Sequence, residues 1–476
     1  MKLAMLDYVV ILAYLVGIVL FGLSFEKRQQ NLGEYFLAGK STSWWALALS
    51  MVSTETSVLS LVGLPGLAYS SNMTFFQTIL GNLVGRILVC IIFIPKYYDG
   101  QYVTAYQLIG TLYGDRVRRA TSGVFLFTRA LADGVRFFAA SLLISIILQT
   151  NVLVAVTILV LLTLVYTAIG GVKAVIWIDV AQFVIYMVGM GLVFYYVLAD
   201  IPGGWAGITQ AAGDKLQILD FSLDPFVTYT VWSGLFAGIF QILAFQGTDQ
   251  LLVQRLLSAR TKNESRAAVL ATAIIVTFQY LFFLIIGVAL YVFFLRHPFE
   301  APLETTDQVL PFFIVNHLPA GLAGLVVAGM LAAQMSGATL NSMASTTVVD
   351  FYPRAEQLSQ KSLVRLARVF TAFWAAVIIG LAVLARKWGS VVEAGITVLG
   401  ITYGGLLGIF LLGILTKTRN ETAALIGMGT SVVTMLAIHF LTPIPFTWYF
   451  AIGTLIAFVV SWGTGQLLSK RIRPRS

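Results

Sequence analysis

Charged residues are scarce in this chain. Aspartate, glutamate, lysine and arginine make up 11% of its 476 residues, whereas 58% are hydrophobic and the mean hydropathy is +0.89. A soluble domain carries about 25% charged residues, so this composition cannot cover a water-facing surface. Apolar runs of roughly eighteen or more residues recur from end to end, and each can cross a bilayer as a helix. The short alternating segments of a membrane barrel are absent. We therefore expect an all-α integral membrane protein.

Cysteine and histidine are also rare. Cys90 is the single cysteine, which excludes an internal disulfide and a thiolate metal cluster. The three histidines, His297, His317 and His439, are scattered along the chain, so we expect no histidine metal site. The first apolar run, residues 6–21, is not followed by a small-residue cleavage site. It predicts a retained span rather than a signal peptide.

The hydropathy pattern predicts about thirteen membrane spans. They lie near residues 6–24, 43–70, 74–97, 120–149, 152–169, 174–199, 226–252, 267–295, 309–349, 363–385, 389–416, 421–441 and 445–468. The segment 309–349 is too long for one crossing, so we expect an external helix before the span proper. No connecting loop is long enough for an independent domain. Residues 1–476 are therefore predicted to form one transmembrane domain.

Basic residues predict the orientation of the chain. If the N-terminus lies outside, inner segments hold 22 of the 30 lysines and arginines. The outer segments then hold Lys2, Lys215, Arg296, Arg386 and Lys387. Lysine and arginine stay on the cytoplasmic side, so we predict a multi-pass protein of the cell membrane with its N-terminus outside and its C-terminus in the cytoplasm. The net charge of +9 is then explained by topology, and no nucleic-acid partner is expected.

A polar segment, residues 50–60, interrupts the second predicted span and contains Glu55. A charge at mid-membrane costs several kcal/mol, so it faces a cavity or a partner. Gly63, Pro65 and Gly66 follow and loosen the helix. A helix broken near the midplane exposes carbonyls that can ligate a cation. The alternative, a kinked helix whose serines bond to their own backbone, does not explain Glu55.

Three charged residues of the fourth span share one helical face. Arg129, Asp133 and Arg136 are spaced i, i+4 and i+7. Such a stripe cannot face lipid. It is either a buried ion-pair network or part of a substrate site, and Glu55 is a possible partner for it.

Two further segments place polar groups within spans. Asp179 lies about one turn into the sixth span, where an acid can hold sodium or a proton; the alternative is a helix cap or a salt bridge to Lys173. Residues 332–342 in the ninth span are small and polar. Hydroxyls and carbonyls suit a hard cation such as sodium. Small residues also let membrane helices approach closely, so both readings stay open.

These segments resemble the sodium:solute symporter family, which includes the sodium–glucose, proline, sialate and iodide symporters. The similar stretches are residues 34–45, 63–69, 170–182, 247–255, 321–352 and 408–420. The resemblance implies the fold of the bacterial leucine transporter, in which two five-helix repeats of opposite topology interlock. The repeats would occupy residues 43–199 and 226–416, with one extra helix at 6–24 and two at 421–468.

The resemblance also implies that sodium is the coupling ion. Matching the segments places its ligands at the carbonyls of Ser53 and Thr56, the carbonyl of Ala333 and the hydroxyl of Ser336. Asp179 matches an acid that some relatives use for a second sodium ion.

The chain departs from the family pattern at this site. Many relatives carry two adjacent hydroxyl residues seven steps before an asparagine, whereas here Ser336-Gly337 stands five steps before Asn341. Matching backwards from Asn341 instead places Gln334 and Met335 at the hydroxyl positions. Thr339 is then only a candidate for the second hydroxyl. Two residues fewer rotate the rest of a helix by about 200°, which predicts an altered or lost site.

The substrate-contacting positions of the family match this chain less directly. Ser60 matches a sugar-contacting position, Phe245 matches an inner-gate aromatic, and Glu55 stands where sugar carriers have asparagine. An acid beside the site disfavours a sugar. We expect a carboxylate-bearing solute held by Arg129 or Arg136, and the alternative is an amine held by Glu55.

The sequence thus predicts a secondary transporter that carries a small organic solute with sodium by alternating access. No nucleophile–base pair, metal cluster or nucleotide motif indicates an enzyme. One alternative is proton coupling through Glu55 or Asp179. Another is a solute sensor, which the short tail after Lys470 disfavours. The expected partners are the solute, sodium and the lipid bilayer, and the oligomeric state stays open.

Overall fold

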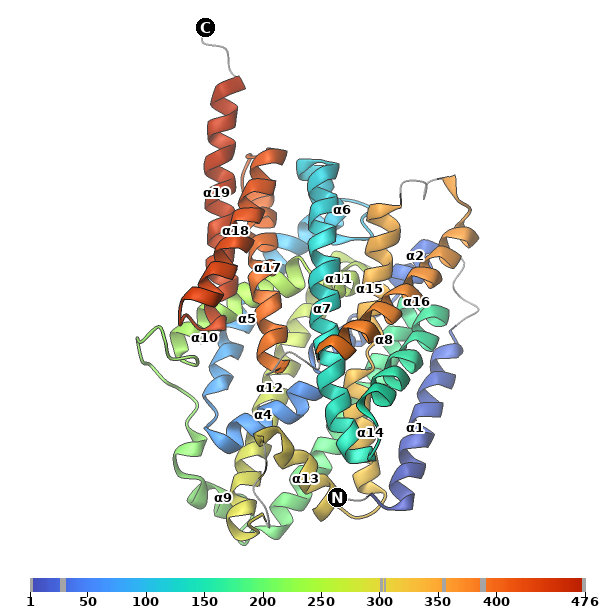
Figure 1. Ribbon diagram of the computed structural model, residues 1–476, viewed down its shortest axis with the longest axis vertical. Helices are drawn as coiled ribbons and strands as arrows, with labels where there is room; N and C mark the ends of the chain where they lie inside the picture. Colours follow the sequence, from blue (N-terminus) through green and yellow to red (C-terminus); the bar gives the residue numbers. More distant parts are fainter. Residues whose placement is uncertain are drawn as a thin grey trace.

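The computed structural model describes residues 3–25, 31–299, 303, 305–352, 357–385 and 391–472, and these form a bundle of helices (Figure 1). The start of α1 (Met5–Leu23) and the end of α19 (Tyr449–Ile472) lie at opposite ends of the bundle. Several basic residues used to predict the orientation lie outside the described residues: Lys2, Lys27, Arg28, Arg354, Arg386, Lys387, Arg473 and Arg475.

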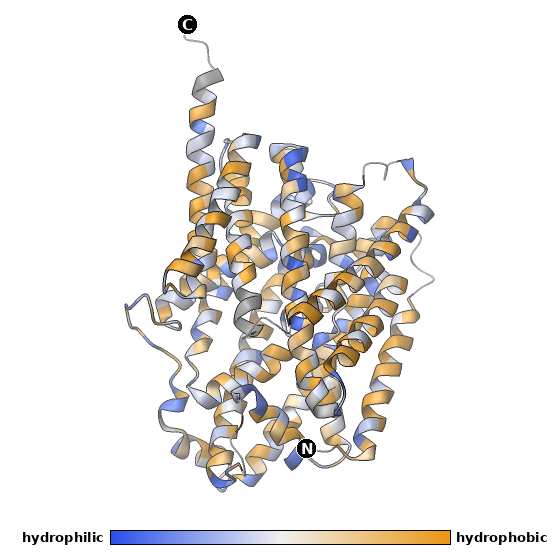
Figure 2. Cartoon of the chain, in the orientation of Figure 1, coloured by the Kyte–Doolittle hydropathy of each residue, from blue (hydrophilic) through white to orange (hydrophobic). Residues whose placement is uncertain are grey.

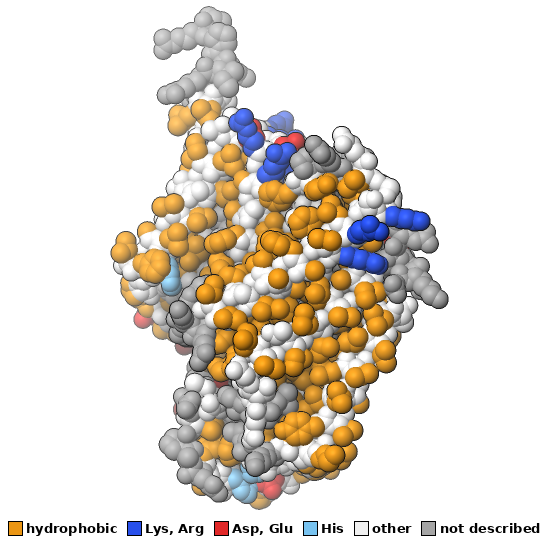
Figure 3. Space-filling view, turned by 45° about the vertical axis from the view of Figure 1, so that its right-hand side comes forward, with side chains coloured by type: hydrophobic (Ala, Val, Ile, Leu, Met, Phe, Trp, Pro, Cys, Tyr) orange, Lys and Arg blue, Asp and Glu red, His pale blue; other side chains and the backbone are white. Residues whose placement is uncertain are grey.

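Apolar side chains cover the flanks of the bundle. Figure 2 shows hydrophobic residues along the helices, and Figure 3 shows lysine and arginine side chains near the upper end of one face. Among the described residues, nine helices are long and apolar enough to cross a membrane, or eleven if two bent pairs are each counted as one span. A total of thirteen spans further requires that α7 (Asp115–Leu148) crosses the membrane and that α8 (Val152–Asp200) is counted as two spans. Thirteen spans therefore stay a prediction.

The second predicted span is broken, as the sequence indicated. It consists of α3 (Trp44–Glu55) and α4 (Val58–Ser70), which meet at 65°. Thr56 and Ser57 between them are extended. The predicted interruption beside Glu55 is therefore confirmed.

A second broken span was not predicted. The expected span 226–252 is instead α10 (Val231–Gly247) and α11 (Gln250–Leu257), bent by 62°. The Thr248 hydroxyl donates to the carbonyl of Ala244 at the end of α10, and the Asp249 carboxylate accepts the Leu251 N–H at the start of α11. Glycine followed by an aspartate cap was the sequence signal for this break.

The long helix α8 has two limbs. Its 49 residues would reach about 74 Å as a straight helix, more than twice a bilayer core. Gly171, with φ of +59°, interrupts it in a conformation that favours glycine. The limbs agree with the predicted spans 152–169 and 174–199.

The predicted separate helix before the ninth span is present. It is α13 (Val309–His317), which precedes α14 (Leu322–Gln334), and its location outside the membrane stays a prediction. A break at residues 335–337, which the sequence did not predict, separates α14 from α15 (Ala338–Thr346). The remaining helices are α2 (Leu32–Leu37), α5 (Gln77–Tyr98), α6 (Ala105–Tyr113), α9 (Trp205–Ala212), α12 (Lys262–Arg296), α16 (Gln360–Ala385), α17 (Val391–Leu415) and α18 (Glu421–Leu441).

The extra helix α1 is fastened to the start of α14 by Asp7. One oxygen of this buried carboxylate accepts the N–H groups of Gly321 and Gly324, each at 2.7 Å. A negative charge is favoured at a helix N-terminus, where N–H groups lack helical partners. A Cβ at Gly324 would lie 2.5 Å from the Asp7 Cα, so glycine permits the close approach.

Asp7→Ala should lower the free energy of unfolding by about 2 kcal/mol, because two buried N–H groups lose a charged acceptor. Thermal unfolding in detergent measures the loss. Asp115→Ala is the matched control: Asp115 also lies in the first turn of a helix but its side chain is 75% exposed, so its loss should cost less than about 0.5 kcal/mol. Equal effects of the two changes would contradict the capping role.

Candidate functional site

The buried carboxylate of Asp179 joins the broken helix α3–α4 to the break between α14 and α15. It accepts hydrogen bonds from the hydroxyls of Ser50 at 2.6 Å and Ser336 at 3.0 Å. The Thr54 hydroxyl lies at 3.4 Å. Asp179 is fully buried on the second limb of α8. Three interrupted helices therefore meet at one carboxylate.

Arg255 is the cationic partner of Asp179. Its Nη2 lies 3.5 Å from the carboxylate, and neither side chain is exposed. The alternative of a salt bridge from Asp179 to Lys173 is therefore wrong. Arg255 follows the predicted span 226–252, and the structure places it in the last turn of α11, inside the protein. Helical spacing indicates partners within one helix, so it could not find this pair between two helices.

Ser53 and Thr56 lie where α3 ends. Ser53 belongs to the last turn, whose carbonyls lack helical partners at a helix end. The Ser53 side chain is fully buried, and its hydroxyl has no partner among the described residues. The Thr56 hydroxyl donates to the carbonyl of Val52 and accepts from the amide of Gln279. Oxygen atoms of this break are thus available inside the bundle.

Ala333 and Ser336 flank the corresponding end of α14. Ala333 is in the last turn of that helix, so the same argument frees its carbonyl. The Ser336 hydroxyl points to Asp179. Thr339 does not share this surrounding, because its hydroxyl donates to Asp133 at 2.9 Å. All five predicted sodium ligands in α3 and α14–α15 therefore lie at or beside the helix breaks, but the Thr339 hydroxyl is engaged by Asp133.

Gly337 has a steric reason to lack a side chain. A Cβ there would overlap the Thr167 hydroxyl on the first limb of α8. This hydroxyl is buried and has no partner within the described part of the chain. Glycine beside Ser336 thus permits close packing of this break against α8.

The stripe Arg129, Asp133 and Arg136 is an ion-pair network. Arg136 donates to Asp133 at 3.1 Å, and Arg129 lies 3.7 Å from the same carboxylate. Arg129 also pairs with Asp249, the cap of α11, a partner that the sequence did not predict. Its guanidinium lies 5.9 Å from the ring centre of Tyr403.

Glu55 is paired outside the stripe. Arg86 of α5 donates to it at 2.5 Å, and Gln246 of α10 donates to its other oxygen at 2.8 Å. The suggested pairing of Glu55 with the stripe is therefore wrong. Ser60 lies on α4, and its side chain is half-buried.

Phe245 packs edge-on against other rings. Its ring centre lies 6.0 Å from that of Tyr403 and 5.4 Å from that of Phe450. Its described ring contacts are thus to α17 and α19.

The charges of this central region balance. Four arginines face four carboxylates in these pairs: Arg86, Arg129, Arg136 and Arg255 with Glu55, Asp133, Asp179 and Asp249. The side chain of Arg136 is 22% exposed, whereas those of the other three arginines are at most 5% exposed. Arg136 is therefore the arginine of this group most open to a ligand.

The sequence model described as the sodium:solute symporter family matches residues 35–430. The chain belongs to this family. Among its relatives, the sodium/sialic acid symporter NanT of Aliivibrio fischeri is 27% identical, with 98% of this chain and 94% of the relative covered. The sodium/sialic acid symporter SiaT of Proteus mirabilis is 28% identical, with 98% and 95% covered. The sodium-coupled monocarboxylate transporter 2 of Mus musculus is 26% identical, with 90% and 71% covered.

Solved structures share the fold of this symporter. A substrate-bound, outward-open sodium-coupled sialic acid symporter is 25% identical, covers 98% of both chains and gives a TM-score of 0.89. Mhp1, a nucleobase–cation symporter in a closed conformation, is 15% identical, covers 93% of this chain and 96% of its own, and gives a TM-score of 0.58. The second likeness concerns the fold alone.

Several predictions from the sequence are thereby confirmed. The symporter has the leucine-transporter fold and is a multi-pass membrane protein. It is a secondary transporter of a small solute rather than an enzyme, and sodium is its coupling ion. The orientation of its termini and the repeat boundaries stay predictions.

The Glu55–Arg86 pair predicts a large coupling energy. Arg86→Gln should cost about 3 kcal/mol of unfolding free energy because it leaves a largely buried carboxylate without its cation. Adding Glu55→Gln should recover much of this loss. Thermal unfolding of both single variants and the double variant measures the coupling.

The exposed pair Lys96–Asp99 is the control, since its side chains are 47% and 65% exposed. Its coupling should be below about 1 kcal/mol. If the double variant at Glu55 and Arg86 is no more stable than Arg86→Gln alone, the pairing is refuted.

Proposed function

We propose that this symporter carries a small organic anion bearing a carboxylate, with Arg136 as its anchor and sodium held where α3, α8 and α14–α15 meet. The unequal exposure of the four central arginines supports this assignment most directly, because the Arg136 side chain is 22% exposed whereas those of Arg86, Arg129 and Arg255 are at most 5% exposed. Arginine binds carboxylates through two parallel hydrogen bonds. Arg136 donates to Asp133 through Nη1, and Asp133 also has Arg129 and Thr339 as partners.

Charge balance favours an anion. The central pairs are neutral together, so a bound sodium ion adds one uncompensated positive charge. A charge in a low-dielectric interior is costly unless it is paired. A solute with one carboxylate neutralises the ion, whereas a cationic amine would add a second positive charge. The relatives named for sialic acid and monocarboxylates support the same class of solute.

The surroundings of Glu55 disfavour the amine alternative. Both of its oxygens are occupied by Arg86 and Gln246. An incoming ammonium group would compete with the Arg86 guanidinium for Glu55. The ion pair gained by the ammonium would replace the one lost by Arg86, so binding would gain no ion pair. We therefore assign Glu55 to holding α5 and α10 against the broken helix, beside the solute.

The proposed sodium ligands are the carbonyls of Ser53, Thr56 and Ala333 and the hydroxyl of Ser336. A hard cation prefers such oxygen ligands. Asp179 accepts a hydrogen bond from the Ser336 hydroxyl. This bond orients the hydroxyl as a sodium ligand, and the carboxylate adds negative charge near the ion. Two repeats, residues 43–199 and 226–416, would then move relative to each other, with the N-terminus outside.

Arg136→Gln should weaken binding of the carboxylate solute roughly 10- to 100-fold, because a charge-assisted pair is lost. A thermal-shift screen of small carboxylates in sodium identifies the solute, and a titration with it measures the affinity. Arg136→Lys should lose less. Arg136→Gln should keep the unfolding temperature of the unaltered protein, since Asp133 keeps Arg129 and Thr339 as partners.

Arg116→Gln is the control for loss of an exposed charge. If the identified solute has no anionic group, or if Arg136→Gln binds it as well as the unaltered protein, the proposed anchor is wrong.

Ser336→Ala should raise the sodium concentration for half-maximal solute uptake by roughly tenfold or more, the effect expected when support for a metal site is lost. Uptake into sealed vesicles, with choline replacing sodium, measures it. Ser342→Ala is the matched control, because its hydroxyl bonds to the Thr339 carbonyl on the same helix. Similar sodium curves for the two variants would argue against a sodium site at the break.

A further inference from the structure

A cavity of about 510 Å³ lies beside the start of α3 and the Gly171 kink of α8, apart from the central site. Its lining comes from the end of α1, the segment before α3, the second limb of α8 and the turn before α12. The lining residues are Phe21, Phe25, Ser41, Thr42, Ser43, Lys173, Trp177 and Arg260. The volume is typical of small-ligand sites.

Two cations line this cavity. Lys173 is half-buried and Arg260 is exposed. Arg260 Nε donates to the carbonyl of Ser41 at 3.1 Å, which fixes its guanidinium at the wall. Among the residues that the structure describes, no carboxylate forms an ion pair with either cation. The four central arginines, by contrast, all have acidic partners.

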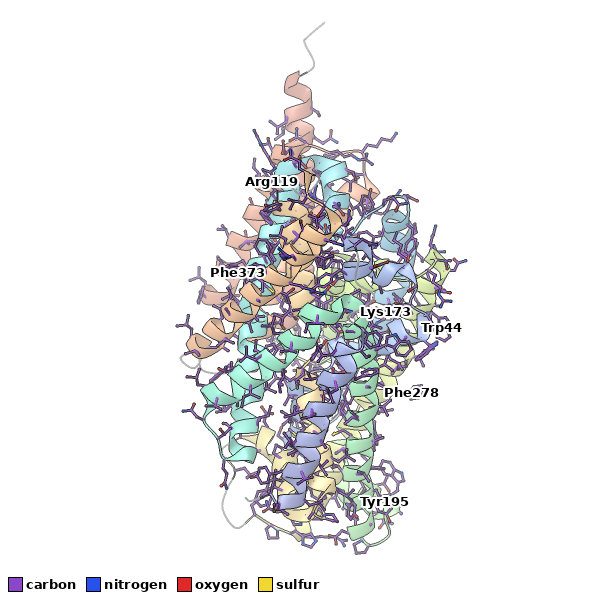
Figure 4. All side chains as sticks on the ribbon, turned by 90° about the vertical axis from the view of Figure 1, so that its right-hand side faces the viewer. Trp44, Arg119, Lys173, Tyr195, Phe278 and Phe373 are labelled. Carbon is purple, nitrogen blue, oxygen red and sulfur yellow. The ribbon has the colours of Figure 1, made fainter. Side chains whose placement is uncertain are left out.

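Aromatic rings connect the cavity to the lipid-facing surface. Trp44 and Trp45 are 44% and 43% exposed, and the Trp45 ring packs edge-on against Trp177 at 5.4 Å. Figure 4 shows Lys173 and Trp44 at about the same height on one flank of the bundle. Phe21 of α1 is also 41% exposed. Tryptophan concentrates at the membrane interface, so these rings are suited to the depth at which lipid headgroups lie.

We propose that this cavity binds the phosphate headgroup of an anionic phospholipid. Lys173 and Arg260 neutralise the phosphate, and the Ser43 side chain supplies a hydroxyl donor beside it, whereas the Ser41 hydroxyl already donates to the carbonyl of Ala38. Basic pockets between membrane helices at the cytoplasmic face are suited to such headgroups. The acyl chains follow the exposed rings of Phe21 and Trp44 along the apolar flank. A soluble phosphate would leave these rings without a function.

The bound lipid would connect both halves of the symporter. Lys173 lies six residues before Asp179 on the same limb of α8, and Arg260 follows α11, which carries Arg255. Thr42 already forms a backbone bridge with Ala259 across this junction. A headgroup that holds Lys173 to Arg260 therefore stabilises the arrangement in which these segments are close.

Thermal unfolding of the purified full-length protein in detergent tests the site. The probes are phosphatidylglycerol, phosphatidylcholine and inorganic phosphate, each titrated separately without solute. Phosphatidylglycerol should raise the unfolding temperature with saturation, whereas the other two should not. Lys173→Gln with Arg260→Gln should weaken the apparent phosphatidylglycerol affinity roughly 30-fold, about fivefold for each cation lost near an anionic lipid.

Two further variants make the result specific. Arg116→Gln with Arg119→Gln removes two exposed cations elsewhere and should leave the titration unchanged. Lys173→Arg with Arg260→Lys keeps both charges and should retain binding within about fivefold, which also separates lost binding from misfolding. Equal stabilisation by phosphatidylcholine, saturation by inorganic phosphate, or an unchanged phosphatidylglycerol response in the Lys173/Arg260 glutamine variant would each overturn the proposal.

Discussion

The hydrogen bonds to Asp179 hold the interior of this symporter together. One buried carboxylate receives Ser50 from a broken helix, Ser336 from a second break, and the guanidinium of Arg255 from a third. Broken helices are tolerated within a membrane only where other groups satisfy the freed backbone. A carboxylate with several donors compensates for its own burial and fixes these three ends relative to one another. The proposed sodium ligands depend on this arrangement, because they are the oxygens that the same breaks release.

Electrical neutrality is the second constraint. Every central arginine has an acidic partner, so the protein by itself has little preference for a cation or an anion in this region. A sodium ion changes that balance and makes an anionic solute the favoured companion. Coupling would then arise because each ligand raises the affinity for the other, by the same factor in both directions.

Features within one helix could be predicted from the sequence, whereas pairings between helices could not. The polar segment at Glu55 predicted the break between α3 and α4, and helical spacing placed Arg129, Asp133 and Arg136 on one face. The partners Arg86, Asp249 and Arg255 come from other helices, and no local pattern connects them to Glu55, Arg129 and Asp179. The sequence shows Gly337 beside Ser336, but it does not show why a glycine stands there. The reason, the approach of Thr167, depends on packing between segments about 170 residues apart.

A high-resolution map of the symporter in lipid, recorded once in sodium and once in choline, tests the central claim most directly. In sodium, we expect density about 2.4 Å from the carbonyls of Ser53 and Thr56 and from the Ser336 hydroxyl, a separation suited to a hard cation of this size. The density should vanish in choline while Asp179 keeps Ser50 and Arg255. A continuous helix past Glu55, or an ion that binds elsewhere while these oxygens face apart, would contradict the account.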